Sequence, residues 1–152
     1  MFFERIGFFM EKYISHGEAE TRDIAKKFAE CLTPGDVIAL IGDLGAGKTA
    51  FTKGLADFFH AEQDVSSPTF TIVNEYNGSL DLYHFDAYRL ENADPDHCDW
   101  MDDYFFGDGV CVVEWAQNIQ EILPRGYFEV KISKNPLLGD DYREITIEKT
   151  EK

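Results

Sequence analysis

The chain has 152 residues, of which 44% are hydrophobic, and its formal net charge at pH 7 is -15. This size predicts a single domain over residues 1–152, with a core large enough for a sheet and a few helices. The acidic balance argues against direct binding of nucleic acid, because phosphate contacts need clustered Lys and Arg. Between Gly54 and Pro124 the sequence has fifteen Asp and Glu and one basic residue, Arg89. These carboxylates form either an ordinary solvated surface or a face that docks a basic protein partner.

The sequence shows no membrane or secretion signal. Its apolar stretches are far shorter than the roughly 20 residues needed to span a bilayer. The start, MFFERIGFFMEKY, has charges that break its apolar pieces, unlike a signal peptide. We therefore expect a cytoplasmic protein with no membrane contact. The cysteines Cys31, Cys98 and Cys111 form no CxxC pair and have no His at zinc-ligand spacing, so they are interpreted as buried free thiols.

The first half of the chain predicts a strand between two helices. Residues 1–9 are interpreted as an N-terminal extension. Residues 18–32 carry apolar side chains at helical spacing with charges between them, which indicates an amphipathic helix. After the turn TPGD, the apolar run at 37–41 predicts a strand, and KTAFTKGLADFF predicts a helix over 48–59.

A β-hairpin is predicted next. The runs SSPTFTIVNEY (66–76) and SLDLYHFDAYRL (79–90) are rich in β-branched and aromatic residues. They are joined by Asn77-Gly78, the dipeptide that most readily adopts the positive φ angles of a tight hairpin turn. The sequence therefore predicts two antiparallel strands with a tight turn at these residues.

The last part of the chain predicts three more strands. The acidic stretch 91–107 is expected to be helical or looped. GVCVVEW (109–115) reads as a short buried strand, and YFEVKIS (127–133) and YREITIE (142–148) as two closing strands around the loop KNPLLGDD.

A glycine-rich loop separates the strand at 37–41 from the following helix. It matches G-x-x-x-x-G-K-[ST], a pattern in which backbone N–H groups curl around phosphates, the lysine bridges the β- and γ-phosphates and the hydroxyl ligates Mg²⁺. The expected nucleotide-binding residues are Gly42, Asp43, Gly45, Ala46, Gly47, Lys48 and Thr49. ATP is favoured over GTP, because the [NT]-K-x-D segment that pairs with guanine is absent.

Two carboxylates at strand ends are candidates for the chemistry of the γ-phosphate. Glu114 closes the apolar strand VCVV, as a Walker B acid does, and is a candidate Mg²⁺ ligand. Asp86 follows an alternating strand and is placed to act on the same metal or on a water. A carboxylate that ends a strand is also often a turn or helix cap, and this alternative stays open for both residues.

Other residues near these motifs have two interpretations each. Arg89 is a counter-ion for nearby carboxylates, or it stabilises transition-state charge or contacts a partner. Ser67 and Thr69 form an ordinary Ser/Pro turn or a loop that senses the γ-phosphate. Trp115 packs in the core or forms a wall of the nucleotide pocket. His84 is expected to pack or hydrogen-bond within the hairpin.

Four separated segments carry a resemblance to one family. They are TPGDVIALIGDLGAGKTAFTKGLA, SSPTFTIVNEY, LYHFDAYRL and VVEWAQNIQEILP. In order and spacing they resemble the TsaE (YjeE) proteins, the bacterial P-loop ATPases needed for threonylcarbamoyl modification of tRNA. The resemblance is close from Glu18 to Pro124 and looser over the final strands. The start MFFERIGFF departs from the family pattern.

The resemblance implies an α/β fold, a P-loop NTPase-like three-layer domain with a mixed parallel and antiparallel sheet. It also implies a Mg²⁺-dependent ATPase that works with the TsaB and TsaD proteins, in which TsaD transfers the threonylcarbamoyl group to the adenosine beside the anticodon. By matching motif, Lys48 would hold phosphates, Thr49 and Glu114 would bind Mg²⁺, Asp86 would position metal or water, and Thr21 would lie near the nucleotide. Lys48, Asp86 and Glu114 are thus the expected catalytic residues.

Two alternatives remain at this point. A small-molecule or nucleotide kinase of the P-loop class shares the strand, loop and helix, although such kinases usually close over the acceptor with several Arg or Lys. A binding module that senses nucleotide without useful turnover would use the same loop. The acidic charge fits a protein that leaves the tRNA to its partners.

Overall fold

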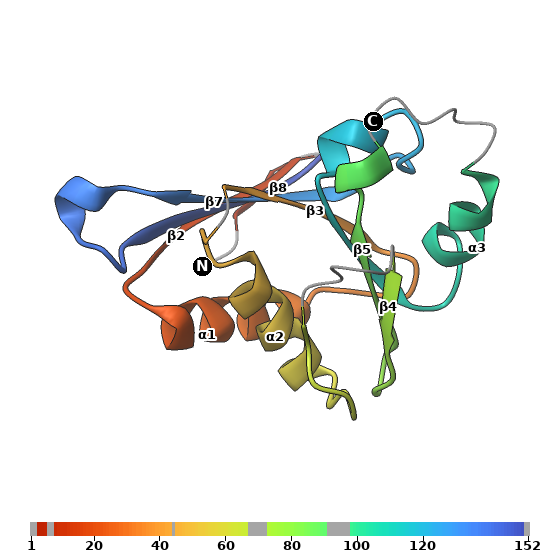
Figure 1. Ribbon diagram of the computed structural model, residues 1–152, viewed down its shortest axis with the longest axis horizontal. Helices are drawn as coiled ribbons and strands as arrows, with labels where there is room; N and C mark the ends of the chain where they lie inside the picture. The colour runs from red at the N-terminus through yellow and green to blue at the C-terminus, as the bar shows by residue number, and fades with distance from the viewer. Residues whose placement is uncertain (1–2, 6–7, 44, 67–72, 91–97, 151–152) are drawn as a thin grey trace.

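The computed structural model describes residues 3–5, 8–43, 45–66, 73–90 and 98–150 (Figure 1). Its described strands form one sheet in the order β1-β2-β8-β7-β3-β6-β5-β4. The strands are β1 (Phe3–Arg5), β2 (Phe8–Ser15), β3 (Val37–Gly42), β4 (Val73–Tyr76), β5 (Leu82–Asp86), β6 (Val110–Glu114), β7 (Phe128–Lys134) and β8 (Arg143–Lys149). None of the helices in these ranges has the length and apolar composition needed to cross a bilayer.

The sheet has a parallel centre and antiparallel sides. β3 runs parallel to both β6 and β7, and β5 runs parallel to β6. β4, β8, β2 and β1 add in antiparallel orientation. The first four residues of β3 and all five of β6 are buried, which explains their continuous apolar runs, because a central parallel strand is covered on both faces. The mixed α/β fold expected from the resemblance is confirmed.

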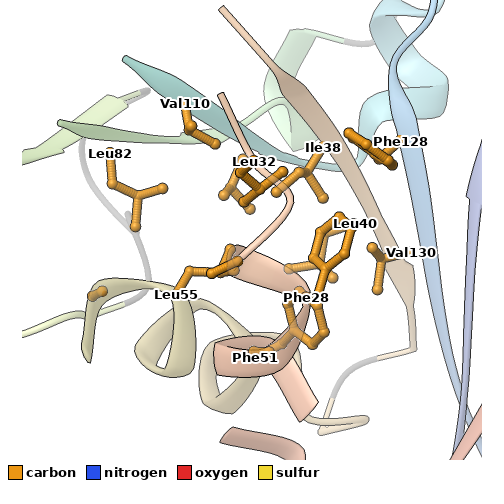
Figure 2. Packing of buried hydrophobic residues seen from close by; sticks show 14 of the residues in the cluster. Phe28, Leu32, Ile38, Leu40, Phe51, Leu55, Leu82, Val110, Phe128 and Val130 are labelled. Carbon is orange, nitrogen blue, oxygen red and sulfur yellow. The ribbon is translucent and has the colours of Figure 1, made fainter. Parts of the chain in front are cut away.

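Two helices, α1 (Glu18–Ala29) and α2 (Lys48–Phe58), lie side by side on one face of the sheet (Figure 1). Phe28 from α1 and Phe51 from α2 meet Leu40 of β3 in the larger core cluster (Figure 2). Neighbouring residues of β3 point the other way, because side chains alternate along a strand. There Ala39 packs in a second cluster with Phe105.

The opposite face is covered by short helical segments. They are η3 (Asp99–Met101), α3 (Asp102–Phe105) and η4 (Ala116–Ile119). Residues 91–97 of the acidic stretch lie outside the described residues. From Asp99 to Phe105 that stretch is helical, which is one of the two structures that the sequence predicts.

The hairpin of β4 and β5 is confirmed, but its predicted turn is wrong. The strands pair up to Tyr76 and Leu82, so five residues join them. Gly78 does not adopt a positive φ angle; instead it packs against the end of α2, where an added Cβ would lie 2.2 Å from the Phe59 carbonyl oxygen. The backbone N–H of Ser79 donates to that same oxygen at 2.7 Å. Docking on α2, rather than a tight turn, sets the path of this loop.

The strand β2 has no counterpart among the sequence predictions. It pairs with β8 from Phe9 to Ser15, so the last residues of the segment interpreted as an extension lie within it. Two of its buried residues are polar, Glu11 and Ser15, whereas the apolar Met10 and Ile14 are 46% and 40% exposed. A pattern with polar residues inside and apolar residues outside does not read as a strand with one face in the core.

Close packing of α1 on α2 depends on a glycine. A Cβ added to Gly54 would lie 2.4 Å from the Arg22 carbonyl oxygen and 2.7 Å from Cβ of Ala25. We expect Gly54→Ala to lower the free energy of unfolding by about 1 to 3 kcal/mol through overpacking, as measured by urea denaturation. Gly17→Ala is the control, because a Cβ there meets nothing within 4 Å. Equal stability of the two variants would contradict the account of this contact.

Candidate functional site

The glycine-rich loop connects β3 to α2 in a conformation that needs its glycines. Gly45 and Gly47 have φ angles of 77° and 112°, which L side chains rarely adopt. A Cβ on Gly42 would lie 2.8 Å from the Ile132 carbonyl oxygen. Gly47 directly precedes α2 and no side chain caps this helix within the described residues. The first N–H groups of α2 therefore face the loop, where an anion can accept their hydrogen bonds.

Lys48 brings the loop together with the Walker B candidate. Its side chain begins α2 and is only 9% exposed. The distance from its Nζ to Oε1 of Glu114 is 3.7 Å, and the same ammonium lies 5.2 Å from the centroid of the Trp115 ring. Three residues that the sequence placed in one site are thus in contact. Thr49, the next residue of α2, is half-buried beside them.

Glu114 is a buried carboxylate with two basic neighbours. Besides Lys48, it contacts His84, whose Nε2 lies 2.5 Å from Oε2 of Glu114. Burial raises the pKa of Glu114, but the hydrogen bond and charge of His84, together with Lys48, outweigh it and lower the pKa below its ordinary value. Glu114 is therefore ionised at neutral pH.

Asp86 lies next to Glu114 at the same end of the sheet. The two residues are in register on the parallel strands β5 and β6, so their side chains project from the same face. Oδ1 of Asp86 accepts a hydrogen bond from the backbone N–H of Tyr88 at 3.0 Å. The turn-capping role of a strand-end carboxylate is thus present, and it also fixes the side chain beside Glu114.

Trp115 follows Glu114 in a conformation that is unusual for a non-glycine residue. Its φ and ψ angles are 57° and 37°, in the left-handed region. Its ring makes an edge contact with Tyr88 at 5.0 Å between centroids and lies below the Lys48 ammonium. The side chain also packs against the second core cluster. Its core packing is therefore confirmed, and its contact with Lys48 places the ring beside the glycine-rich loop.

Thr21 connects α1 to the glycine-rich loop. It is buried, its Oγ1 lies 2.8 Å from Oγ of Ser15, and its Cγ2 would be 4.0 Å from a Cβ on Gly47. A pocket of about 210 Å³ opens at this junction. It is lined by the start of α1, the loop, the first turn of α2 and the β8 end of the β7–β8 hairpin, namely Gly17, Glu18, Thr21, Gly45, Ala46, Gly47, Ala50, Asp141 and Arg143.

Arg143 is a residue of this site that the sequence analysis misses. From β8, its Nε donates to the carbonyl of Ala46 at 2.9 Å and its Nη2 to that of Gly45 at 3.3 Å. Its Nη1 donates to the carbonyls of Asp140 and Tyr142 at 2.9 and 2.8 Å. One guanidinium thus ties the glycine-rich loop to the β7–β8 hairpin. Because the partners are backbone atoms almost a hundred positions away, no sequence motif signals this contact.

Loss of this clamp should weaken anion binding by the loop. We expect Arg143→Ala to raise the dissociation constant for ADP about tenfold, on the scale of one charge-assisted hydrogen bond. Fluorescence titration with a labelled ADP measures this change. Arg125→Ala is the control, because Arg125 is exposed and lies outside the site. An affinity equal to that of the control would show that the loop keeps its shape without the clamp.

Several expected residues are outside this constellation. Arg89 is exposed and makes no ion pair with any described residue, so its interpretation as a counter-ion finds no support there. Ser67 and Thr69 lie outside the described residues.

Cys98 and Cys111 are buried free thiols as expected, but Cys31 is exposed, contrary to the prediction, because it follows the end of α1.

The residues present fit a magnesium nucleotide. No group of three or more His, Cys, Asp or Glu in the described ranges is arranged to hold a metal by itself. Mg²⁺ in nucleotide sites usually has one or two protein oxygen ligands and shares the phosphates and waters. The Thr49 hydroxyl and the ionised Glu114 at the end of β6 offer that donor set.

Comparison with known proteins identifies the family. The family model of the threonylcarbamoyl adenosine biosynthesis protein TsaE matches residues 15–145. The chain belongs to the TsaE family. A tRNA threonylcarbamoyladenosine biosynthesis protein TsaE of Bacillus subtilis is 52% identical over 128 residues, which cover 84% of this chain and 78% of that protein. The TsaE protein of Treponema pallidum is 37% identical, over 88% of this chain and 97% of its own length.

A solved structure supports the same assignment. The crystal structure of Bacillus subtilis YdiB superposes with a TM-score of 0.75 and 44% sequence identity. The match covers 93% of this chain and 86% of that one. The likeness extends beyond the glycine-rich loop that many unrelated nucleotide-binding proteins share, so this chain is a TsaE-family member in fold as well as in sequence.

Proposed function

We propose that the chain binds and hydrolyses Mg·ATP in the cytoplasm, in support of threonylcarbamoyl modification of the tRNA adenosine next to the anticodon. The observation that carries this proposal is the contact of Lys48 with Glu114 at the open end of α2. A phosphate-binding lysine and a strand-end carboxylate meet where N–H groups can hold an anion. Membership of the TsaE family supports the pathway.

Each residue of the site has a role in this proposal. The loop N–H groups and Lys48 bind the phosphates, so the ammonium moves from Glu114 to the nucleotide. Thr49 and Glu114 would hold Mg²⁺, which when bound supplies positive charge to the phosphate oxygens. Asp86, fixed beside Glu114, orients the attacking water. Trp115 and Thr21 border the bound nucleotide on two sides.

The proposed partners are the TsaD and TsaB proteins, in a hetero-complex. The chain itself is unsuited to bind tRNA, because it carries a net charge of -15. Around η3 and α3, Asp99, Asp102 and Asp103 are exposed. Such a face favours a basic protein surface over RNA, and it leaves tRNA binding to the partners.

The test is reconstitution from purified components. We expect weak ATP hydrolysis by the isolated chain and a marked increase when TsaB and TsaD are both present. Modified adenosine in the tRNA should form only when this chain and ATP are included. Equal hydrolysis with and without the partners, or equal modification with and without this chain, would overturn the proposal.

A further inference from the structure

The proposed function gives no role to His84, the residue that contacts Glu114 most closely. His84 lies on β5 and its side chain is fully buried. Its Nε2 lies 2.5 Å from Oε2 of Glu114, and its Nδ1 has no hydrogen-bond partner among the described residues. Buried polar atoms normally have hydrogen-bond partners. The contact that His84 does make is to a carboxylate of the site, which indicates a role beyond core packing.

The two oxygens of Glu114 have different partners. Oε1 faces the Lys48 ammonium at 3.7 Å, whereas Oε2 faces His84. Nε2 lies at hydrogen-bond distance from a carboxylate oxygen, which accepts, so the tautomer that satisfies this contact carries its proton on Nε2 and donates it to Oε2. The three side chains come from α2, β6 and β5, so the contact spans three separate elements.

Binding of phosphates removes one of these partners. In the proposed function Lys48 binds the β- and γ-phosphates, so its 3.7 Å contact with Glu114 would be weakened or lost when nucleotide binds. A carboxylate that is 7% exposed and has lost one of its two basic partners depends on the other to keep its orientation. His84 contacts the other oxygen of Glu114, so its hydrogen bond does not compete with the contact that Lys48 makes.

We propose that His84 is a positioning residue, whose Nε2–H bond to Oε2 holds Glu114 in the orientation in which this carboxylate would serve as a Mg²⁺ ligand. This inference rests on the proposed function. Hydrogen bonds from a neighbouring side chain to a metal-binding group orient that group, and their loss weakens metal affinity about 10- to 100-fold. His84 itself touches neither the nucleotide nor the metal.

The test separates binding of the nucleotide from binding of the metal. Calorimetry measures the dissociation constant for ADP in Mg²⁺ and in EDTA. The value in EDTA divided by the value in Mg²⁺ gives the contribution of the metal to ADP binding. We expect His84→Leu to reduce this ratio about tenfold or more, while the EDTA value changes by less than about threefold. His84→Gln, whose amide N–H reaches a similar position, should restore the ratio. Tyr83→Phe, on the same strand but the other face, is the control.

The ADP affinities of the two His84 variants decide whether the hydrogen bond to Glu114 supports metal binding. An unchanged ratio in His84→Leu overturns the inference, and so does a loss in His84→Gln as large as that in His84→Leu, because shape rather than the donor would then matter. If the unchanged protein binds no ADP in either buffer, the proposed function fails, and the inference falls with it for a different reason.

A measurement on the unchanged protein covers the case in which His84→Leu does not fold. In ¹⁵N-histidine NMR spectra, the Nε2–H proton of His84 should be visible and shifted downfield by its bond to a carboxylate. Glu114→Gln should move this signal, whereas Asp86→Asn should leave it near its place. A signal that does not respond to Glu114→Gln would overturn the inference.

Discussion

Replacing Lys48 with Ala is expected to abolish tight binding of Mg·ATP, with a rise in the dissociation constant of at least about 100-fold. The substitution removes the ammonium that contacts Glu114 beside the loop and leaves this buried carboxylate with His84 as its remaining basic partner among the described residues. Competition with a labelled nucleotide measures the loss. In a complementation test, the same variant should fail to support growth.

A control on the same helix distinguishes this effect from a general change of charge. Lys53 lies on α2 and its Nζ is 3.6 Å from Oε1 of Glu18, in a partly exposed pair that contributes little to stability. Lys53→Ala should bind nucleotide as the unchanged protein does. If the two variants lose affinity equally, Lys48 has no special role in phosphate binding.

Replacing Glu114 with Gln is expected to separate binding from hydrolysis. The amide keeps the shape of the side chain but cannot supply the negative charge that a Mg²⁺ ligand needs. We expect ATP hydrolysis in the presence of TsaB and TsaD to fall about 100- to 1000-fold, the scale of losing one charge-stabilising group in a site. Affinity for ADP in EDTA should change by only a few fold, because the phosphates contact the loop and Lys48.

This variant also decides between turnover and sensing. If nucleotide binding alone were the useful event, a Glu114 variant would still support growth and tRNA modification. The ATPase account predicts loss of both, while the purified variant remains folded in a thermal denaturation experiment. Growth at the normal rate would favour a nucleotide-sensing module.

The sequence predicts the centre of the site well because its signal is local. The loop, the strand before it and the helix after it are contiguous, and the glycine spacing reflects φ angles that the structure has at Gly45 and Gly47. Glu114 could be recognised because it ends an apolar strand, and β6 does pair with β3. Asp86 could be recognised in the same way, because it follows an alternating strand, and the family pattern adds Thr21.

The remaining features depend on contacts that a linear pattern does not encode. His84 and Arg143 act on residues 30 and 97 positions away, through pairings of strands that no short motif specifies. The strand β2 is not predicted because two of its buried residues, Glu11 and Ser15, are polar. The five-residue loop after Tyr76 packs against α2 and does not form the tight turn that Asn77-Gly78 favours. In each case, tertiary packing overrides the local signal.

The central claim is that backbone N–H groups, Lys48 and the carboxylates around Glu114 together form a site for a magnesium adenine nucleotide. Isothermal titration calorimetry of the full folded chain with ADP and with a non-hydrolysable ATP analogue, in the presence of Mg²⁺, tests it most directly. The account predicts saturable binding at one site per chain, weakened by EDTA and lost in Lys48→Ala. Absence of binding heat and of competition with labelled nucleotide in the folded, unchanged protein would contradict it.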